Sequence, residues 1–237
     1  HEFHHSIPVG NNYWAHLCET DSYDSFSEIF VKQEYADFIP KETILKVLDL
    51  GANYGYFSLW LQSRCPNRII NSLMIEPSPR CKRSLTKLVN DKKFVGQFKF
   101  LQRIISSPNQ NYTDFFDRPH MGGSCFSSSK EDKCVKIKPL TENEVFDNIG
   151  HSYELLKCDI EGSEWDLLIN YSHLFLNAKF VILEWHSWHS GNGGIDQIIK
   201  KLKSLNFKII KKSKPTKAIG RSGEVGLLLA KNQIWGE

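Results

Sequence analysis

The chain has no apolar stretch long enough to cross a membrane, and its six cysteines follow no recognisable spacing. A membrane helix needs about 20 consecutive apolar residues, and no such run occurs in the 237 residues. The absence of a CxxC pair argues against a zinc site and is typical of the reduced thiols of a cytosolic protein. We therefore expect a cytoplasmic protein with no membrane span.

The composition lacks the marks of disorder and of a strongly charged protein. Hydrophobic residues make up 41% and charged residues 24% of the chain, which is typical of a globular protein. The length suits one α/β domain with a full core. A net charge of +3 is too small to indicate a nucleic-acid partner. A lysine-rich run over residues 200–217 is best interpreted as a solvated surface.

The most informative stretch begins with an apolar run over Lys46 to Leu50, which suits a buried parallel strand. Gly51 and Gly55 then give positions without a Cβ, where the backbone can turn tightly or approach a ligand. Helical spacing of apolar residues follows and predicts a helix that begins near Tyr54, and a second apolar strand ends at Glu76. Strand, glycine turn, helix, strand and terminal acid indicate a nucleoside-binding βαβ unit, with Glu76 placed for ribose hydroxyls.

The same turn lacks what other nucleotide sites need. No lysine follows Gly55, so the turn is not a phosphate-binding P-loop. Three residues without glycine separate Gly51 from Gly55, so the dinucleotide fingerprint is incomplete. Asp49 precedes the first glycine and favours a cationic or hydroxyl-rich ligand, for which S-adenosylmethionine is suitable. The alternative is a structural turn with a solvated Asp49.

Two further segments, over residues 153–164 and 179–186, read as buried strands that end in acidic or imidazole side chains. The ordered series Leu-Asp-Leu-Gly-Ala-Asn-x-Gly-Tyr-Phe, Glu-Pro, Lys-x-Asp-Ile-Glu-Gly-x-Glu and Leu-Glu-x-His resembles the FkbM family of S-adenosylmethionine-dependent O-methyltransferases. The resemblance spans about residues 30–190 and implies the class I, Rossmann-like methyltransferase fold. We expect an α/β protein with a seven-stranded, mainly parallel sheet and a C-terminal antiparallel hairpin over residues 207–230.

The resemblance also implies where S-adenosylmethionine binds. The glycine turn would hold its methionine part, Glu76 its ribose, and residues 103–107 its adenine. A small-residue segment, Gly122 to Ser124, matches one that precedes the fourth core strand in many members. The predicted cofactor-binding residues are Asp49, Gly51, Ala52, Asn53, Tyr54, Gly55, Glu76, Pro77, Ile105, Ser106 and Asp159.

The predicted catalytic residues are His186, Asp159 and Glu184, which all follow predicted strands. Ligands of open α/β sheets bind beyond the carboxyl ends of strands. His186 is our first candidate for the general base, because an unperturbed histidine, with a pKa of about 6.5, is largely neutral at pH 7. The alternative for His186 is a purely structural histidine, and the alternative for Asp159 is a helix N-cap. A divalent metal held by the three residues is an alternative that we do not favour, so no metal ligand is predicted.

The organisation expected along the chain is simple. Residues 1–40 would form an arm, irregular over residues 1–20, and a helix over residues 25–38. Residues 41–237 would form the methyltransferase domain, with a mobile cover loop near 107–135. This cover could contain a short hairpin, with Tyr112 to Phe116 and Val135 to Lys138 as its candidate strands. Trp185, Trp188 and His189 are candidates for the acceptor pocket.

The predicted function is S-adenosylmethionine-dependent methylation of a hydroxyl on a small molecule, glycan or natural product. Nucleic-acid methylation is the first alternative, but no Asn-Pro-Pro-Tyr or Asp-Pro-Pro-Tyr motif follows the fourth strand. A non-catalytic cofactor-binding or scaffold protein is the second. The intact set of Asp49, Glu76 and Asp159 argues against loss of the site.

Overall fold

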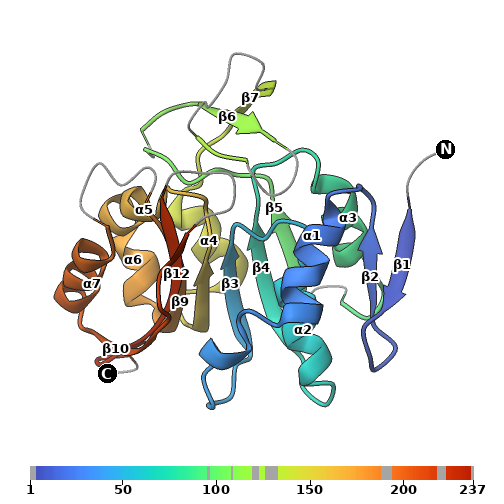
Figure 1. Ribbon diagram of the computed structural model, residues 1–237, viewed down its shortest axis with the longest axis horizontal. Coiled ribbons are helices and arrows are strands. Elements are labelled where there is room, and N and C mark those ends of the chain that lie inside the picture. Colours follow the sequence, from blue (N-terminus) through green and yellow to red (C-terminus); the bar gives the residue numbers. More distant parts are fainter. Residues whose placement is uncertain are drawn as a thin grey trace.

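The computed structural model describes residues 4–94, 97–107, 109–118, 123–125, 133–187, 194–217 and 223–235. Within them a mainly parallel central sheet is flanked by helices (Figure 1). The strands of this sheet are β3 (Lys46–Leu50), β4 (Asn71–Ile75), β5 (Phe98–Leu101), β8 (Tyr153–Cys158), β9 (Ala178–His186), β10 (Phe207–Lys212), β11 (Thr216–Lys217) and β12 (Glu224–Asn232). Among the described helices, none has the length and apolar character needed to cross a membrane.

The strand order is β10-β12-β9-β8-β3-β4-β5. The strands β3, β4, β5, β8 and β9 pair in parallel, and β12 runs antiparallel to both β9 and β10. The described sheet has eight strands rather than the expected seven, because the short β11 also pairs with β12. The predicted α/β class with a mainly parallel sheet is confirmed.

The helices that cover the sheet belong to two separate cores. Successive side chains of a strand point to opposite faces, so Val47 packs into one core and Leu48 into the other. The first core joins α2 and α3 to the N-terminal segment, and the second joins α4, α5, α6 and α7. These helices are α2 (Tyr56–Arg64), α3 (Lys82–Asn90), α4 (Glu142–Ile149), α5 (Glu164–Asn170), α6 (Ser172–Leu176) and α7 (Gly194–Ser204).

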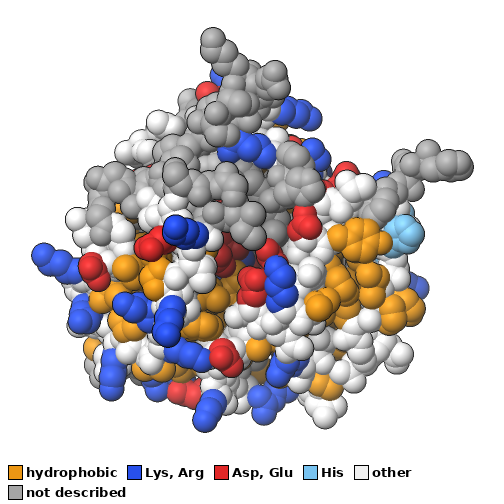
Figure 2. Space-filling model, in the orientation of Figure 1, with side chains coloured by type: hydrophobic (Ala, Val, Ile, Leu, Met, Phe, Trp, Pro, Cys, Tyr) orange, Lys and Arg blue, Asp and Glu red, His pale blue; other side chains and the backbone are white. Residues whose placement is uncertain are grey.

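Local signals explain where several helices begin. Thr141 and Glu144 form a capping box at the start of α4, in which each side chain bonds the other residue's backbone N–H. The helix α2 begins at Tyr56, two residues later than expected, because Gly55 has a φ of 80° and lies outside the helical region. Over α7 and β10, lysines gather at the surface (Figure 2), in line with the predicted solvated run.

The N-terminal segment differs from the expectation. Its first part, predicted as irregular, forms an antiparallel hairpin of β1 (His5–Pro8) and β2 (Trp14–Leu17). The expected single helix is also wrong: α1 (Ser22–Phe26) runs into a π-helix, Ser27–Lys32. Gln33, at a φ of 53°, ends this helix, and a 3-10 helix over Ala36–Phe38 follows. The turn at Gln33 directs the following residues toward the sheet.

The described part of the predicted cover contains two strands, β6 (Thr113–Asp117) and β7 (Lys133–Ile137), which pair antiparallel. They lie beyond the carboxyl ends of the parallel strands, at the top of Figure 1. Both strands were expected at nearly these positions. Gly122, like residues 119–121 and 126–132, lies outside the described residues.

Candidate active site

A cleft of about 1220 Å³, counting space open to solvent, lies at the carboxyl ends of β3, β4 and β8. This is where open α/β sheets bind ligands. The predicted site residues that line it are Gly51, Ala52, Asn53, Tyr54, Glu76, Pro77, Ile105, Asp159 and Glu184. The predicted residues Asp49, Gly55, Ser106 and His186 do not line it. Ser106 instead lies 2.6 Å from Thr113, hydroxyl to hydroxyl.

The glycine turn leaves β3 in a conformation that only glycine tolerates well. Gly51 has a φ of 70°, and a Cβ there would lie 1.6 Å from the Asp159 carbonyl oxygen. The N–H groups of Gly51 and Ala52 both donate to the Ile75 carbonyl at 3.0 Å. The turn therefore packs directly against the residue that follows β8, which brings Asp159 beside the predicted cofactor site.

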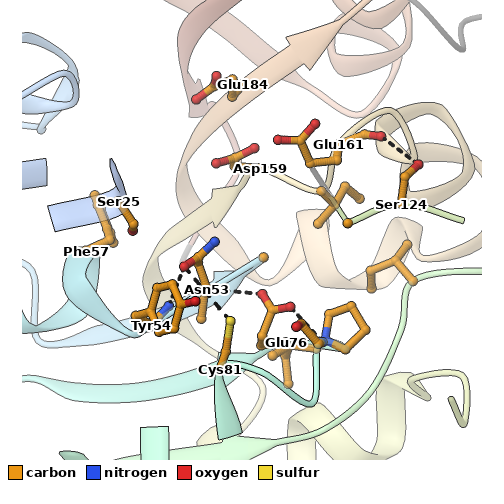
Figure 3. A pocket seen from close by; sticks show the side chains of 18 of the residues that line it. Ser25, Asn53, Tyr54, Phe57, Glu76, Cys81, Ser124, Asp159, Glu161 and Glu184 are labelled. Carbon is orange, nitrogen blue, oxygen red and sulfur yellow. Dashed lines mark hydrogen bonds between the residues drawn. The ribbon is translucent and has the colours of Figure 1, made fainter. Parts of the chain in front are cut away.

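Glu76 is fixed at the end of β4 by backbone donors. Its carboxylate accepts hydrogen bonds from the N–H of Asn53 and the N–H of Ser78, each at 2.8 Å. Figure 3 shows Glu76 next to Asn53 on the floor of the cleft. Burial raises the pKa of Glu76 to about 7, and the two backbone donors oppose that rise. A buried carboxylate in this position is suited to accept hydrogen bonds from ligand hydroxyls.

Asp49 lies beneath the cleft and contacts a lysine that lines it. The side chain is fully buried, and Ser58 donates to its Oδ2 at 2.8 Å. Lys157 Nζ lies 3.5 Å from Asp49 Oδ1, 3.7 Å from Asp159 Oδ2 and 2.8 Å from the Gly51 carbonyl, to which it donates. Burial alone lowers the pKa of Lys157, but Asp49 and Asp159 raise it above its ordinary value.

Lys157 lines the cleft and was missed from sequence. The available signal was a lysine at an inward position of the apolar strand β8, since lysine is rarely buried without a partner.

The acidic end of the cleft is lined by the carboxylates of Asp159, Glu161 and Glu184, which lie in the same part of Figure 3. The Tyr35 hydroxyl donates to Glu184 Oε2 at 2.8 Å and lies 3.2 Å from Asp159 Oδ2. Burial and then the charge of Asp159 raise the pKa of Glu184 to about 8. Glu161 has a φ of 54°, a conformation that non-glycine residues rarely adopt.

His186 lies behind these carboxylates. The side chain is buried, and its Nδ1 lies 2.9 Å from Oε1 of the buried Glu164. Its Nε2 lies 3.9 Å from Asp159 Oδ1 and 3.8 Å from Glu184 Oε1. Burial alone lowers the pKa of His186, but Glu164 and its hydrogen bond raise it to about 10. A protonated imidazole has no lone pair for a proton, which favours the carboxylates over His186 as the general base.

The N-terminal segment contributes side chains that sequence reasoning did not assign to the site. Asp21, Glu28, Glu34 and Tyr35 line the cleft opposite the sheet. Burial raises the pKa of Glu28 to about 7, and the charge of Glu34 adds to the shift. No local sequence pattern predicts the contacts of Tyr35 with Asp159 and Glu184, because these residues are more than 100 positions apart. Of the residues expected in the acceptor pocket, Trp185 is buried and does not line the cleft, and Trp188 and His189 lie outside the described residues.

Comparison with known proteins agrees with the fold. A solved FkbM methyltransferase from Methylobacillus flagellatus KT is 17% identical, with a TM-score of 0.51; the match covers 89% of this chain and 50% of that one. An O-methyltransferase family protein from Burkholderia thailandensis is 11% identical, with a TM-score of 0.51, and the match covers 92% and 60%. At such identities the likeness shows the fold alone. No curated protein matches the chain.

The model of the methyltransferase FkbM domain matches residues 49–209. This span contains the glycine turn, Glu76, the Asp159 segment and the Glu184–His186 segment, and it is well over half of the chain. The chain therefore belongs to the FkbM family of S-adenosylmethionine-dependent methyltransferases.

Proposed function

We propose that the protein transfers the methyl group of S-adenosylmethionine to a hydroxyl oxygen of a small molecule, glycan or natural product. The observation that carries the proposal is the cleft itself, in which a backbone-lined half adjoins a half lined by carboxylates. The unpaired state of all six cysteines supports the expected cytoplasmic location.

The first half has the features that the cofactor needs. Gly51 lines this half, and its lack of a Cβ lets the backbone of the turn pack against the Asp159 carbonyl oxygen. Glu76 would accept the ribose hydroxyls, and Ile105 would cover one side of the adenine. Lys157 lies between this half and the acidic half, where its contacts with the Gly51 carbonyl and with Asp159 would fix the position of one relative to the other. When bound there, S-adenosylmethionine supplies an electrophilic methyl group whose C–S bond breaks toward sulfur as the acceptor oxygen attacks.

The second half would orient the acceptor and take its proton. Asp159 and Glu184 line the cleft and are fixed by Tyr35, so either carboxylate can receive the hydroxyl proton and pass it to solvent. His186 and Glu164 lie behind them and would act as positioning residues. General base catalysis of this kind contributes about 10²–10⁴-fold to rate. The several carboxylates around this half would repel a phosphodiester backbone, which disfavours a nucleic-acid acceptor.

The proposal is tested in two stages with the whole chain. Calorimetry should detect binding of S-adenosylmethionine and of S-adenosylhomocysteine, and absence of both would overturn it. Mass spectrometry should then detect methylated products from a panel of hydroxyl compounds, with matched amines and thiols in the same reaction. Products from amines or thiols alone would overturn the O-directed part.

The roles of the acidic residues are tested in variants. Glu184→Gln should lower turnover by about 10²–10⁴-fold with nearly unchanged cofactor affinity. Glu42→Gln is the control, because Glu42 pairs with Lys179 and Lys231 at the surface and does not line the cleft. Unchanged turnover in both Glu184→Gln and Asp159→Asn would exclude these two carboxylates as the base.

A further inference from the structure

Three side chains at the acidic end turn one ligand atom each toward a common point. They are Asp159, Glu184 and His186, each of which has one ligand atom within 4.8 Å of the ligand atoms of the other two. His186 Nε2 lies 3.9 Å from Asp159 Oδ1 and 3.8 Å from Glu184 Oε1. At metal–ligand bonds of about 2.1 Å, neighbouring ligands are about 3 Å apart. A shift of less than 1 Å per side chain would therefore bring all three to a single cation.

The other oxygen of each carboxylate is held elsewhere. Tyr35 donates to Glu184 Oε2 and lies near Asp159 Oδ2, while Lys157 also faces Asp159 Oδ2. These contacts fix the rotation of both carboxylates, so that Oδ1 and Oε1 keep facing His186 Nε2. The cluster is thus oriented by contacts on its outer side, unlike a group of solvated acids.

The imidazole is oriented independently of the two carboxylates. His186 is 3% exposed, and its Nδ1 lies 2.9 Å from Glu164 Oε1, a carboxylate that is itself 2% exposed. A carboxylate on the far nitrogen is the usual outer partner of a metal-binding histidine, because it fixes the ring and its tautomer. In this protein Glu164 holds the ring so that His186 Nε2 faces Asp159 and Glu184.

A third carboxylate is directed into the same space at a conformational cost. Glu161 lies in the left-handed region, at a φ of 54°, and Figure 3 shows its carboxylate turned toward Asp159. Such backbone conformations are unfavourable for a residue other than glycine and gather at functional sites.

We infer that Asp159, Glu184 and His186 bind one divalent transition-metal cation of the Mn²⁺ type at the acceptor end of the cleft, and that the cation replaces the proton on His186 Nε2, which is released to solvent. Mixed carboxylate and imidazole donors suit this class better than Ca²⁺, which takes six to eight oxygens. The cation would neutralise the paired carboxylates and hold the acceptor oxygen, and this role rests on the proposed function. Asp159 and Glu184 would then be ligands, and the neighbouring Glu161 would take the proton in their place.

The test titrates Mn²⁺ into chelator-treated protein and follows the electron paramagnetic resonance of the free ion. We expect a single site whose bound-ion spectrum shows coupling to one imidazole nitrogen. Asp159→Asn, Glu184→Gln and His186→Gln should each weaken Mn²⁺ binding by about tenfold or more, and His186→Gln should also remove the nitrogen coupling. Glu164→Gln, which changes only the outer partner, should weaken binding by about 10-fold.

Glu28→Gln is the matched control, because Glu28 is an acid of the same cleft that is not among the three ligands. Its Mn²⁺ affinity should stay within about threefold of the wild type, and thermal unfolding of each variant checks its fold. No bound Mn²⁺ at millimolar concentration, or equal losses in Glu28→Gln and the ligand variants, would overturn the site. Mn²⁺ bound through these ligands without any cofactor binding would leave the site standing and reject the proposed function.

Discussion

The two halves of the cleft differ in the groups that form them: one is mainly backbone and the other is mainly charged side chains. The cofactor half consists mainly of backbone, from the turn after β3 and the end of β4, and the buried carboxylate of Glu76 is held there by two N–H groups. The acceptor half consists of charged side chains from β8, β9 and the N-terminal segment, held by one another. The first is therefore fixed by local geometry and the second by a network of charges.

This difference predicts different responses to mutation. A change in the backbone half should act through strain and steric clash, which no second mutation at a charged residue can relieve. A change in the charged half leaves another charge without its partner, so a second, neutralising mutation should restore part of the loss.

The largest effect is expected for Gly51→Ala. The added Cβ would lie 1.6 Å from the Asp159 carbonyl oxygen, at a φ of 70°. Strain of about 1–3 kcal/mol and overpacking of about 1–3 kcal/mol sum to as much as about 6 kcal/mol of unfolding free energy. Urea unfolding of the wild type and of Gly51→Ala measures this loss of unfolding free energy. Gly150→Ala is the control, because Gly150 has a φ of 85° but its Cβ would meet only Lys46 Nζ, at 3.8 Å. Equal losses in the two variants would contradict the steric account.

The next largest effect is expected for Lys157→Met, which tests the charged half. Removing one partner of a buried pair costs about 3–5 kcal/mol, because Asp49 is left as an uncompensated charge. The double variant Lys157→Met, Asp49→Asn should regain part of this stability, since it removes that charge. Thermal or urea unfolding of the single and double variants gives the coupling. Losses that simply add would show that the charges are not a network.

A smaller effect is expected on ligand affinity at the backbone half. Glu76→Ala should weaken S-adenosylhomocysteine binding by about 1.5–3 kcal/mol, the usual value for hydrogen bonds to a charged group. Calorimetry measures the affinity, and Glu184→Ala serves as the comparison from the acceptor half. Glu184 belongs to the half that would face the transferred methyl, which S-adenosylhomocysteine lacks. Glu184→Ala should therefore bind S-adenosylhomocysteine almost normally. A weaker effect at Glu76 than at Glu184 would reverse the assignment of the two halves.

The contrast between the halves also explains what the sequence could reveal. The strand, glycine turn, helix and terminal acid lie within about 30 consecutive residues, so their periodicity and turn chemistry are readable from order alone. The predictions of β3 and of β4, which ends immediately before Glu76, were accordingly confirmed. The turn Gly10 to Asn12, with φ between 50° and 94°, had an equally local signal that we did not use.

The acceptor half could not be read in the same way. Tyr35 meets Glu184 across 149 positions of sequence, and its place in the cleft depends on how the π-helix ends at Gln33. His186 was correctly expected at a strand end, but its burial behind two carboxylates depends on the packing of α5, which carries Glu164. Such contacts belong to the tertiary fold, and no local pattern encodes them.

The smallest expected effect is a pH dependence of cofactor-product binding through Glu76. Burial raises the pKa of this carboxyl to about 7. A protonated carboxyl accepts hydrogen bonds more weakly than a carboxylate and has a proton of its own on one oxygen. Two ligand hydroxyls should therefore bind the ionised form more tightly, so affinity should rise as the pH rises through 7 and fall as it falls. Between about pH 6 and pH 8 the ionised fraction changes by about tenfold, or about 1.4 kcal/mol. Calorimetry with S-adenosylhomocysteine measures this, and Glu76→Gln corrects for titration of the ligand, since its amide does not ionise. A wild-type profile that parallels that of Glu76→Gln would show that Glu76 does not hold the hydroxyls as a carboxylate.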